Sequence, residues 1–187
     1  ITETSCIVLT DDFDLDNKSL KDRKDNVDIG LHITLTDFKP LTKCSILLSS
    51  NKLPKLKKLL FKSFYKTSLT NELKKEIYCQ FEKFVDCFGF KPKFIDGHHH
   101  VQQIPMVAKI LFSLIKDKYD KQNYPWIRLL SDSFINILSR KIAIPKALII
   151  GMFGINNKKL AIKHNVNFNQ GFSGFYNFSD NVEFEKK

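Results

Sequence analysis

Residues 93–105 read KFIDGHHHVQQIP, and the organisation of the chain follows from this stretch. Residues 93–97 form a short apolar run that ends at glycine, and three histidines follow at once. Pro105 suits the first turn of a helix, because a proline there removes no helical hydrogen bond. The stretch therefore predicts a strand, a turn rich in imidazole groups and a helix over residues 105–119.

A second strand is predicted upstream, at residues 27–36, VDIGLHITLT. From residue 29 on, aliphatic side chains alternate with small or polar ones, which is the period of a β-strand. The aliphatic face holds Ile29, Leu31, Ile33 and Leu35, and the other face holds Gly30, His32, Thr34 and Thr36. His32 is thus expected near the end of a strand, on the face opposite the aliphatic residues.

Strands and helices alternate along the rest of the chain. Further strands are predicted at residues 5–10, at 126–130 and at the start of 166–178, which continues as a glycine-rich loop. Further helices are predicted at residues 53–66, at 69–88 with Ser68 as N-cap, at 131–152 with a break at Pro145, and at 156–165. This alternation indicates an α/β fold with a parallel sheet.

The charge pattern argues against a sequence-specific nucleic-acid-binding protein. Of 30 basic residues only Arg23, Arg128 and Arg140 are arginines, and the lysines are scattered along the chain. Nucleic-acid readers usually cluster their basic residues and use arginine in bidentate contacts. A net charge of +10 still predicts some non-specific attraction to polyanions. No apolar run reaches the ~18 residues of a membrane-spanning helix.

The segment 53–66 predicts a basic amphipathic helix, with Leu53, Leu56, Leu60 and Phe64 at helical spacing. Contact with an acidic membrane surface is one interpretation. The favoured one places the leucines in the core and the lysines in solvent.

The four cysteines form no CxxC pair, and Cys79 and Cys87 are expected as small buried side chains of a helix. This usage predicts a reducing compartment, the cytoplasm. The chain starts at Ile1 without the charged beginning of a signal peptide, so we expect it to start inside a domain.

Four of the five histidines lie at the ends of two predicted strands: His32, and then His98, His99 and His100. That edge of a parallel sheet builds the active site in many α/β folds. On an extended chain His98 and His100 would face one pocket and His99 would face away. Neutral imidazole is a common ligand of divalent metals. A solvated histidine loop and a hydrogen-bonded core His32 are the alternatives that the residues alone leave open.

The motifs IGLHITLTDFKPL, KPKFIDGHHHVQQIP, WIRLL and QGFSGFYNF, in this order, resemble those of the YdjC-like (ChbG/HpnK) carbohydrate deacetylase family. The similarity spans residues 1 to about 178. The resemblance implies a distorted (β/α) barrel of the NodB type, here incomplete because 187 residues are fewer than the ~200–250 of a full barrel. We expect one partial domain, 1–187, without the first and last strands. The implied reaction is hydrolysis of an N-acetyl group on an amino sugar or oligosaccharide by a metal-activated water.

The resemblance also implies roles for two residues. His32 and His98 match the family's metal-binding histidines, and the ion is expected to be Mg²⁺ or Zn²⁺. Asp96 suits either a group that orients a histidine or a turn residue at the strand end, and Arg128 suits either a substrate contact or a surface ion pair. His100 is expected near the ligands or in contact with substrate. A small amino sugar or acetylated oligosaccharide is the expected partner, with no specific nucleic acid, no transmembrane segment and a homodimer left open.

The departures from the family pattern matter equally. The family's A-D-D-F-G strand supplies an aspartate ligand and the catalytic base. DDFD at 11–14 imitates it, but the register places Asp11 and Asp12 in the loop after the following strand. We therefore expect the acidic strand upstream of Ile1, with no catalytic residue in this chain. The last histidine of H-x-H-V-H is Gln102 here, a poorer ligand than imidazole.

The chain alone is therefore expected to be inactive. A non-catalytic relic or split-gene fragment, acting at most as a binding module, is the second hypothesis. A polyanion-binding protein driven by its lysines is the third. Two smaller features are also open: Gly171 and Gly174 suit either a loop that approaches the sugar or an ordinary turn, and His164 is expected in solvent.

Overall fold

The structure is a computed structural model that describes residues 2–13, 19–45, 48, 51–65, 68–129 and 144–169, with the backbone alone at 65 and 144–153. Its strands are β1 (Glu3–Cys6), β2 (Asp28–Ile33), β3 (Phe94–Gly97) and β4 (Trp126–Ile127). Its helices are α2 (Leu56–Tyr65), α3 (Leu69–Phe88), α4 (Pro105–Lys118) and α6 (Ile144–His164), with 3₁₀ turns η1 (His98–Gln103) and η2 (Lys121–Asn123). The predictions for Gly171, Gly174 and residues 131–143 lie outside the described residues.

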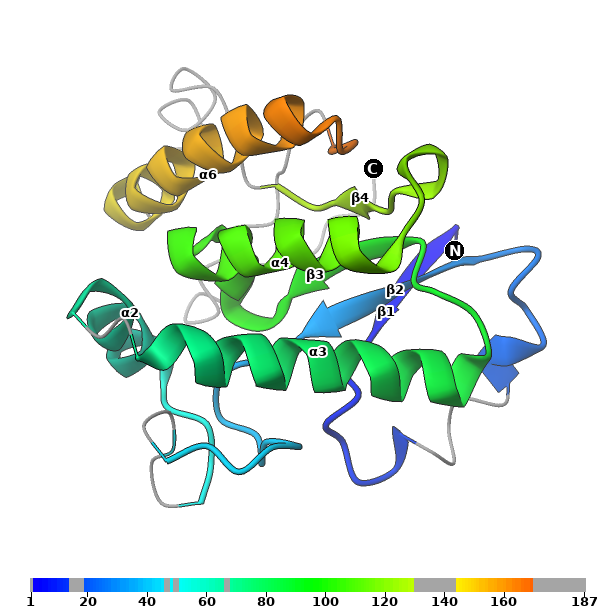
Figure 1. Cartoon of the computed structure of the whole chain (residues 1–187), viewed down its shortest axis with the longest axis horizontal. Coiled ribbons are helices and arrows are strands. Elements are labelled where there is room, and N and C mark those ends of the chain that lie inside the picture. The colour runs from blue at the N-terminus through cyan, green and yellow to red at the C-terminus, as the bar shows by residue number, and fades with distance from the viewer. Residues whose placement is uncertain are drawn as a thin grey trace, which may run out of the picture.

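The four strands form one parallel sheet in the order β1-β2-β3-β4. Leu31 of β2 pairs with Cys6 of β1 and with Ile95 of β3. An isolated parallel bridge joins Ile127 to Phe168, shortly after α6. Helices α3 and α4 lie side by side over the sheet, and α6 packs against α4 (Figure 1). The predicted α/β class with a parallel sheet is confirmed.

The core lies between one face of the sheet and the helices. As the alternation predicts, Ile29, Leu31 and Ile33 of β2 are at most 1% exposed. The apolar stripe of α3 is buried as well, and comprises Leu73, Ile77, Phe81, Phe84 and Phe88. Gly89 ends α3 in the left-handed conformation, at a φ of 75°. These helices therefore cover the aliphatic face of the sheet and leave the His32 face to other contacts.

The His32 face is aromatic where the strands begin and polar where they end. A Cβ on Gly30 would lie 2.5 Å from the ring of Phe94, so only glycine lets that ring lie across β2. Phe94 stacks on Trp126, with ring centroids 4.6 Å apart. His32 and Asp96 follow two residues further along their strands and are paired in register. The polar groups thus meet at the carboxyl edge of the sheet, next to the aromatic side chains of Phe94 and Trp126.

Several element boundaries differ from the prediction. β1 comprises residues 3–6 rather than 5–10, β2 ends at Ile33 rather than at residue 36, and β4 comprises two residues. Residues 144–164 form one helix, where the pattern predicts a break at Pro145 and a separate helix 156–165. Pro145 is the second residue of α6, where a missing N–H removes no helical hydrogen bond.

The ends of the two preceding helices also differ from the prediction. Ser68 precedes α3 without making a capping hydrogen bond through its side chain. The predicted stripe on 53–66 is wrong at Phe64, which is 62% exposed, whereas Leu59 is fully buried. Leu53 is buried but precedes α2, which begins at Leu56, and Phe64 lies five residues after Leu59, about 140° around the helix, so it faces away from the core.

No helix in the described part of the chain has both the length and the apolar character that crossing a bilayer demands. His164 is half-buried rather than solvated, with its ring centroid 5.5 Å from that of Phe112. Burial, helped by the charges of Lys116 and Lys163, lowers the pKa of His164.

The cysteines are four thiols without a disulfide, and their exposure differs from the prediction. Cys79 is exposed rather than buried, because it faces away from the core side of α3; Cys87 is half-buried and Cys44 is buried. Burial, together with the charge of Asp96, raises the pKa of Cys6 to about 11.

We expect Cys79 to be the thiol that a water-soluble disulfide reagent modifies fastest at pH 8. Burial and the charges of Glu76 and Glu82 also raise the pKa of Cys79, but its side chain is the exposed one. The pKa of Cys6 is raised to about 11, Cys44 is shielded by burial and Cys87 is half-buried. Stopped-flow labelling followed by peptide mass analysis measures the order, and Cys79→Ser should remove the fast phase. A fast phase that persists in Cys79→Ser would show that the exposure of α3 is misassigned.

Candidate functional site

The carboxyl ends of β2, β3 and β4 bring His32, Asp96 and Arg128 together. The Nδ1 atom of His32 lies 2.7 Å from one carboxylate oxygen of Asp96. The guanidinium of Arg128 donates to the other oxygen at 2.9 Å, and the Ser5 hydroxyl donates to it at 3.2 Å. Asp96 is 2% exposed, so its charge is buried and compensated by these three partners. Residues that the sequence places far apart thus form one hydrogen-bond network.

The network sets the tautomer of His32. Because the Asp96 carboxylate only accepts, the His32 Nδ1 atom carries the hydrogen and donates it. The lone pair of the neutral ring is then on Nε2, on the side away from Asp96. A carboxylate that orients an imidazole in this way is the usual support of a metal-binding histidine.

Arg128 is held in a fixed position on the same face. Besides Asp96, its guanidinium lies 3.7 Å from Glu3 and 5.6 Å from the centroid of the Phe94 ring. Its side chain remains 33% exposed. The guanidinium can therefore donate further hydrogen bonds to a molecule that approaches this face.

The histidine run does not follow the extended alternation that the sequence predicts. His99 and His100 have φ angles of 52° and 58°, in the left-handed region, and the run forms the 3₁₀ turn η1. The rings of His98 and His99 consequently lie 4.0 Å apart between centroids, and both belong to a cluster with Asp37. The expectation that His99 faces away from the pocket of His98 is wrong.

His98 stands between the two groups of polar residues. Its ring centroid is 5.9 Å from that of His32 and 5.6 Å from that of Phe38, both edge to face. Burial lowers the pKa of His98; the charges of His99 and His32 act in the same direction, and Asp37 opposes them. Below-normal basicity keeps this imidazole neutral at neutral pH, which is the form that binds metals.

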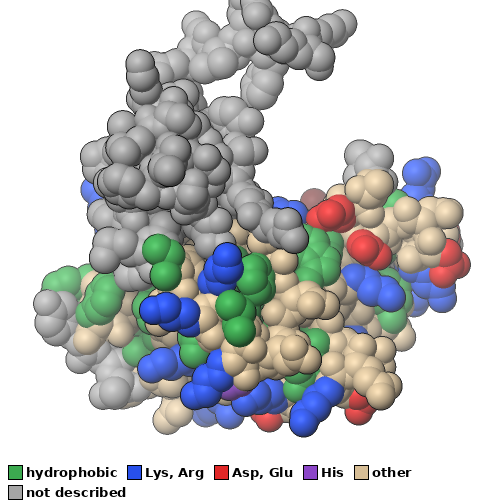
Figure 2. Space-filling view, turned by 90° about the horizontal axis from the view of Figure 1, so that it is seen from above, with side chains coloured by type: hydrophobic (Ala, Val, Ile, Leu, Met, Phe, Trp, Pro, Cys, Tyr) green, Lys and Arg blue, Asp and Glu red, His purple; other side chains and the backbone are tan. Residues whose placement is uncertain are grey.

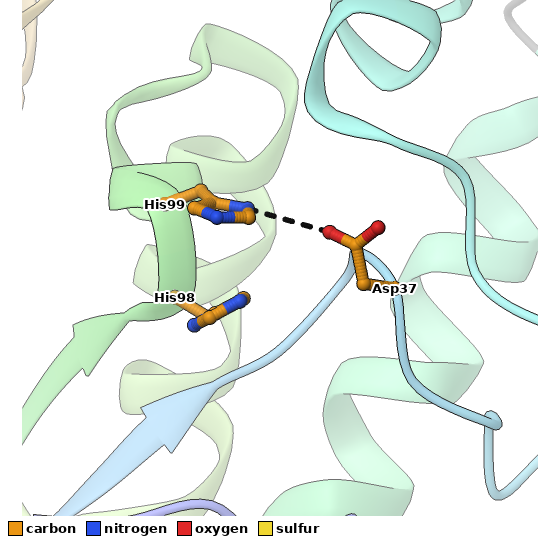
Figure 3. A group of neighbouring side chains, drawn as sticks. All are labelled: Asp37, His98 and His99. Carbon is orange, nitrogen blue, oxygen red and sulfur yellow. Dashed lines mark ion pairs between the residues drawn. The ribbon is translucent and has the colours of Figure 1, made fainter. Parts of the chain in front are cut away.

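Asp37 is the residue of the site that the sequence interpretation missed. It follows the end of β2, and one of its carboxylate oxygens lies 3.6 Å from His99 Nδ1 (Figure 3). Thr36 Oγ1 is 3.0 Å from the same nitrogen. The sequence does contain a signal for Asp37, because this acidic residue follows the strand that carries His32. Neighbouring parallel strands end at one edge of the sheet, so a residue in that position is a candidate for the site.

Two buried polar side chains of α3 hold the segment that carries Asp37. Glu76 accepts hydrogen bonds from the backbone N–H groups of Leu41 and Thr42 at 3.1 and 2.9 Å. Gln80 accepts from the N–H of Thr34 and donates to its carbonyl oxygen, at 3.0 and 2.7 Å. Glu76 and Gln80 are fully buried. The loop after β2 is therefore anchored at both ends to the helix behind it.

Gln102 and the acidic pair near the N-terminus stand away from this cluster. Gln102 is 2% exposed, and its amide donates to the carbonyl oxygen of Arg128 at 3.1 Å. Its Oε1 atom has no hydrogen-bond partner among the described residues. Asp11 and Asp12 lie in an exposed turn after β1, as the register argument places them. Gln102 thus supports the backbone under Arg128.

A cavity in the described part of the chain lies elsewhere. It has a volume of about 770 Å³ and is lined by residues that include Phe88, Lys93 and Tyr119, near the start of β3. None of the site residues named above lines it. On the face drawn in Figure 2, lysine and arginine side chains lie at several places among hydrophobic and uncharged groups. This distribution agrees with the scattered lysines of the sequence.

A comparison with protein families matches nearly the whole chain. A family model described as YdjC-like protein matches residues 1–186. The resemblance that the motifs indicate is therefore confirmed.

Two relatives are the chitooligosaccharide deacetylases of Yersinia pestis (strain Pestoides F) and Yersinia pseudotuberculosis serotype O:1b (strain IP 31758). Each is 35% identical over 91 residues, which is 48% of this chain and 35% of the relative. The matched segment thus spans about a third of those enzymes.

A solved structure, that of a cellobiose-phosphate cleavage protein from Enterococcus faecalis V583, has a similar fold. The TM-score is 0.62 at 18% sequence identity, over 96% of this chain and 60% of that protein. At this identity the likeness concerns the fold alone.

Proposed function

The chain belongs to the YdjC-like protein family, and we propose that it acts in hydrolysis of the N-acetyl group of an amino sugar or acetylated oligosaccharide. The observation that carries the proposal is the bond from His32 to the buried Asp96, next to the neutral imidazole of His98. The activity is proposed for the whole protein, since the chain covers 60% of the solved structure that it resembles. We further propose that residues 1–187 form one domain, whose sheet is part of a distorted (β/α) barrel.

The residues fit a divalent cation at His32 and His98. The Nε2 atom of His32 is available because Asp96 occupies Nδ1, and the lowered pKa of His98 leaves that ring uncharged. Imidazole ligands favour Zn²⁺ or another transition ion, whereas Mg²⁺ prefers oxygen. When bound, such an ion polarises the acetyl carbonyl and lowers the pKa of a water molecule.

The other residues of the network orient and bind. Asp96 holds the His32 ring in one tautomer and one rotation, and Arg128 shields the buried carboxylate charge. The exposed donors of Arg128 are placed to bind hydroxyl or carbonyl oxygens of a sugar. His100, at the left-handed turn of η1, stays a proposed substrate contact.

The test is acetate release from N-acetylglucosamine oligomers by the purified whole protein, with metal content measured on the same sample, and residues 1–187 alone are expected to release none. We expect His98→Ala to lose metal and any activity, because it removes a ligand. His164→Ala is the matched control, since that histidine lies on α6 beside Phe112 and outside the site. Equal metal content in wild type and His98→Ala would contradict the ligand assignment.

The same experiment separates the alternatives. Saturable binding of the oligomers without acetate release would favour the second hypothesis, a non-catalytic binding module. Tight binding to nucleic acid that weakens steeply with salt, without oligomer binding, would favour the polyanion-binding hypothesis.

A further inference from the structure

We propose that Asp37, His98 and His99 form a divalent-cation site, suited to zinc or another transition-metal ion, in which the loop after β2 supplies the carboxylate. The site shares His98 with the proposed function, but it does not rest on hydrolysis or on His32. It differs from the ligand set that the sequence predicts in two of its three members.

The positions of the ligand atoms support the proposal. One nitrogen of each imidazole and one oxygen of Asp37 all lie within 4.8 Å of one another. The His99–Asp37 separation is 3.6 Å, and ligands ~2.0–2.1 Å from a tetrahedral zinc are about 3.3 Å apart. Figure 3 shows the two histidines at the end of β3 with the Asp37 carboxylate directed toward His99. Small side-chain rotations are enough to close the set around one ion.

The donor types and their exposure suit an exchangeable ion. Two imidazoles and one carboxylate form the three-ligand set found at zinc sites that keep a position open for water or substrate. His99 and Asp37 have side chains 45% and 40% exposed, so an ion can reach them from solvent. His98 is half-buried and fixes the inner side of the site.

The backbone holds two of the ligands in an uncommon conformation. Five non-glycine residues in the described part of the chain have positive φ, and Asp37 (66°) and His99 (52°) are two of them. The left-handed turn at His99 is what rotates its ring toward His98 and Asp37. Glu76 and Gln80 anchor the loop that carries Asp37. The left-handed conformations and the anchored loop thus hold the three ligands together, and a simple surface ion pair needs neither.

His32 is a neighbour of this site and not a member of it. Its Nδ1 atom is bonded to Asp96, and its ring centroid is 5.9 Å from that of His98. The three-residue cluster includes Asp37 and His99 instead. The two ligand sets therefore make opposite predictions for substitutions at His32 and at Asp37.

The experiment measures Zn²⁺ binding to the full chain by competition with a chromophoric chelator, for wild type and four variants. Asp37→Asn and His99→Asn remove a ligand but keep a residue that tolerates positive φ. Each is expected to weaken zinc binding by at least about tenfold, since loss of a mere supporting group costs that much. His164→Ala is the control and should stay within about twofold of wild type, whereas His32→Gln tests the other proposed ligand pair.

Each outcome decides between the two sets. Unchanged zinc affinity in Asp37→Asn and His99→Asn, with circular dichroism showing the fold retained, would overturn the site. A loss in His32→Gln that leaves Asp37→Asn unaffected would assign the ion to the His32–His98 pair instead. Zinc binding to residues 1–187, together with a whole protein that releases no acetate, would sink the proposed function and leave this site standing. As a second readout, the visible absorption of bound Co²⁺ should change in Asp37→Asn if its carboxylate is a ligand.

Discussion

Asp96→Asn is expected to lower acetate release by the whole protein about 10- to 100-fold, the usual cost of removing a group that orients a metal-binding histidine. The side chain keeps its size but loses its charge and one acceptor. Its amide NH₂ must then face either His32 or Arg128, both of which donate to Asp96 in the native protein. If the NH₂ group faces His32, the ring is held in the other tautomer with its hydrogen on Nε2, and if it faces Arg128, that bond is lost. In both cases the Arg128 charge loses its buried anionic partner.

The same substitution has an effect that does not depend on catalysis. A buried donor without an acceptor costs about 1–3 kcal/mol, so the free energy of unfolding should fall by that amount. Urea denaturation measures it beside kcat/KM. Asp12→Asn is the matched control: it changes an exposed aspartate in the D-D-F motif, and both quantities should stay at wild-type values. A stable Asp96→Asn protein with wild-type kcat/KM would contradict the orienting role of the network.

The strand ends were predictable because they depend on short-range pattern. Alternation around His32 and the apolar run before Gly97 predict two strands, and parallel pairing then requires their ends to meet at one edge. The register His32–Asp96 agrees with that expectation. The α/β class followed from the same alternation of strands and helices.

The orientation of the histidines was not predictable in the same way. The prediction assumed an extended chain after Gly97, whereas His99 and His100 adopt left-handed conformations. Histidine tolerates that region better than most residues but has no sequence signature for it. One backbone change of this kind moves His99 into the site, and the simple alternation of the three histidines no longer applies.

The boundaries failed for a different reason. Pro145 was read as a break, but a proline in the first turn costs a helix nothing. Phe64 is exposed because it lies five residues after the buried Leu59, about 140° around the helix. In the first case the position of the helix start, which pattern alone locates poorly, decided the result, and in the second the i, i+4 spacing drifted off the buried face.

Glu76 and Gln80 interrupt the apolar stripe of α3, and this pattern in the sequence already indicates a buried polar contact. Glu76 and Gln80 are spaced four apart, so they share one face of the helix with the buried stripe. A buried carboxylate needs partners, and the loop after β2 supplies them. Such a pair predicts a loop folded over the helix, although not which loop.

Glu76→Ala is expected to lower the free energy of unfolding by about 1–3 kcal/mol. Its two carboxylate oxygens accept from the N–H groups of Leu41 and Thr42, from the Thr42 hydroxyl and from the Gln80 amide. Alanine leaves the buried Gln80 amide without this acceptor, at a cost of about 1–3 kcal/mol, and the donors of the exposed Leu41 and half-buried Thr42 turn to water. Partial entry of water into the space limits the total. Urea denaturation measures the change.

Glu82→Ala is the matched control on the same helix. That side chain is 46% exposed and pairs with Lys118, so its loss should cost no more than about 1 kcal/mol. A cost below about 1 kcal/mol for Glu76→Ala would show that the loop is not held through this carboxylate.

Glu76→Gln carries the argument from stability to the site. It keeps one acceptor oxygen but turns the other into a donor that faces an N–H group, so the loop should loosen while the helix and sheet remain folded. Because Asp37 lies on that loop, zinc affinity should fall in Glu76→Gln even though Glu76 contacts none of the three proposed ligands in the described structure. If zinc affinity stays unchanged while the loop loses protection from hydrogen exchange, the position of Asp37 does not depend on its anchor in α3, and the carboxylate ligand must be held by the turn at Asp37 alone.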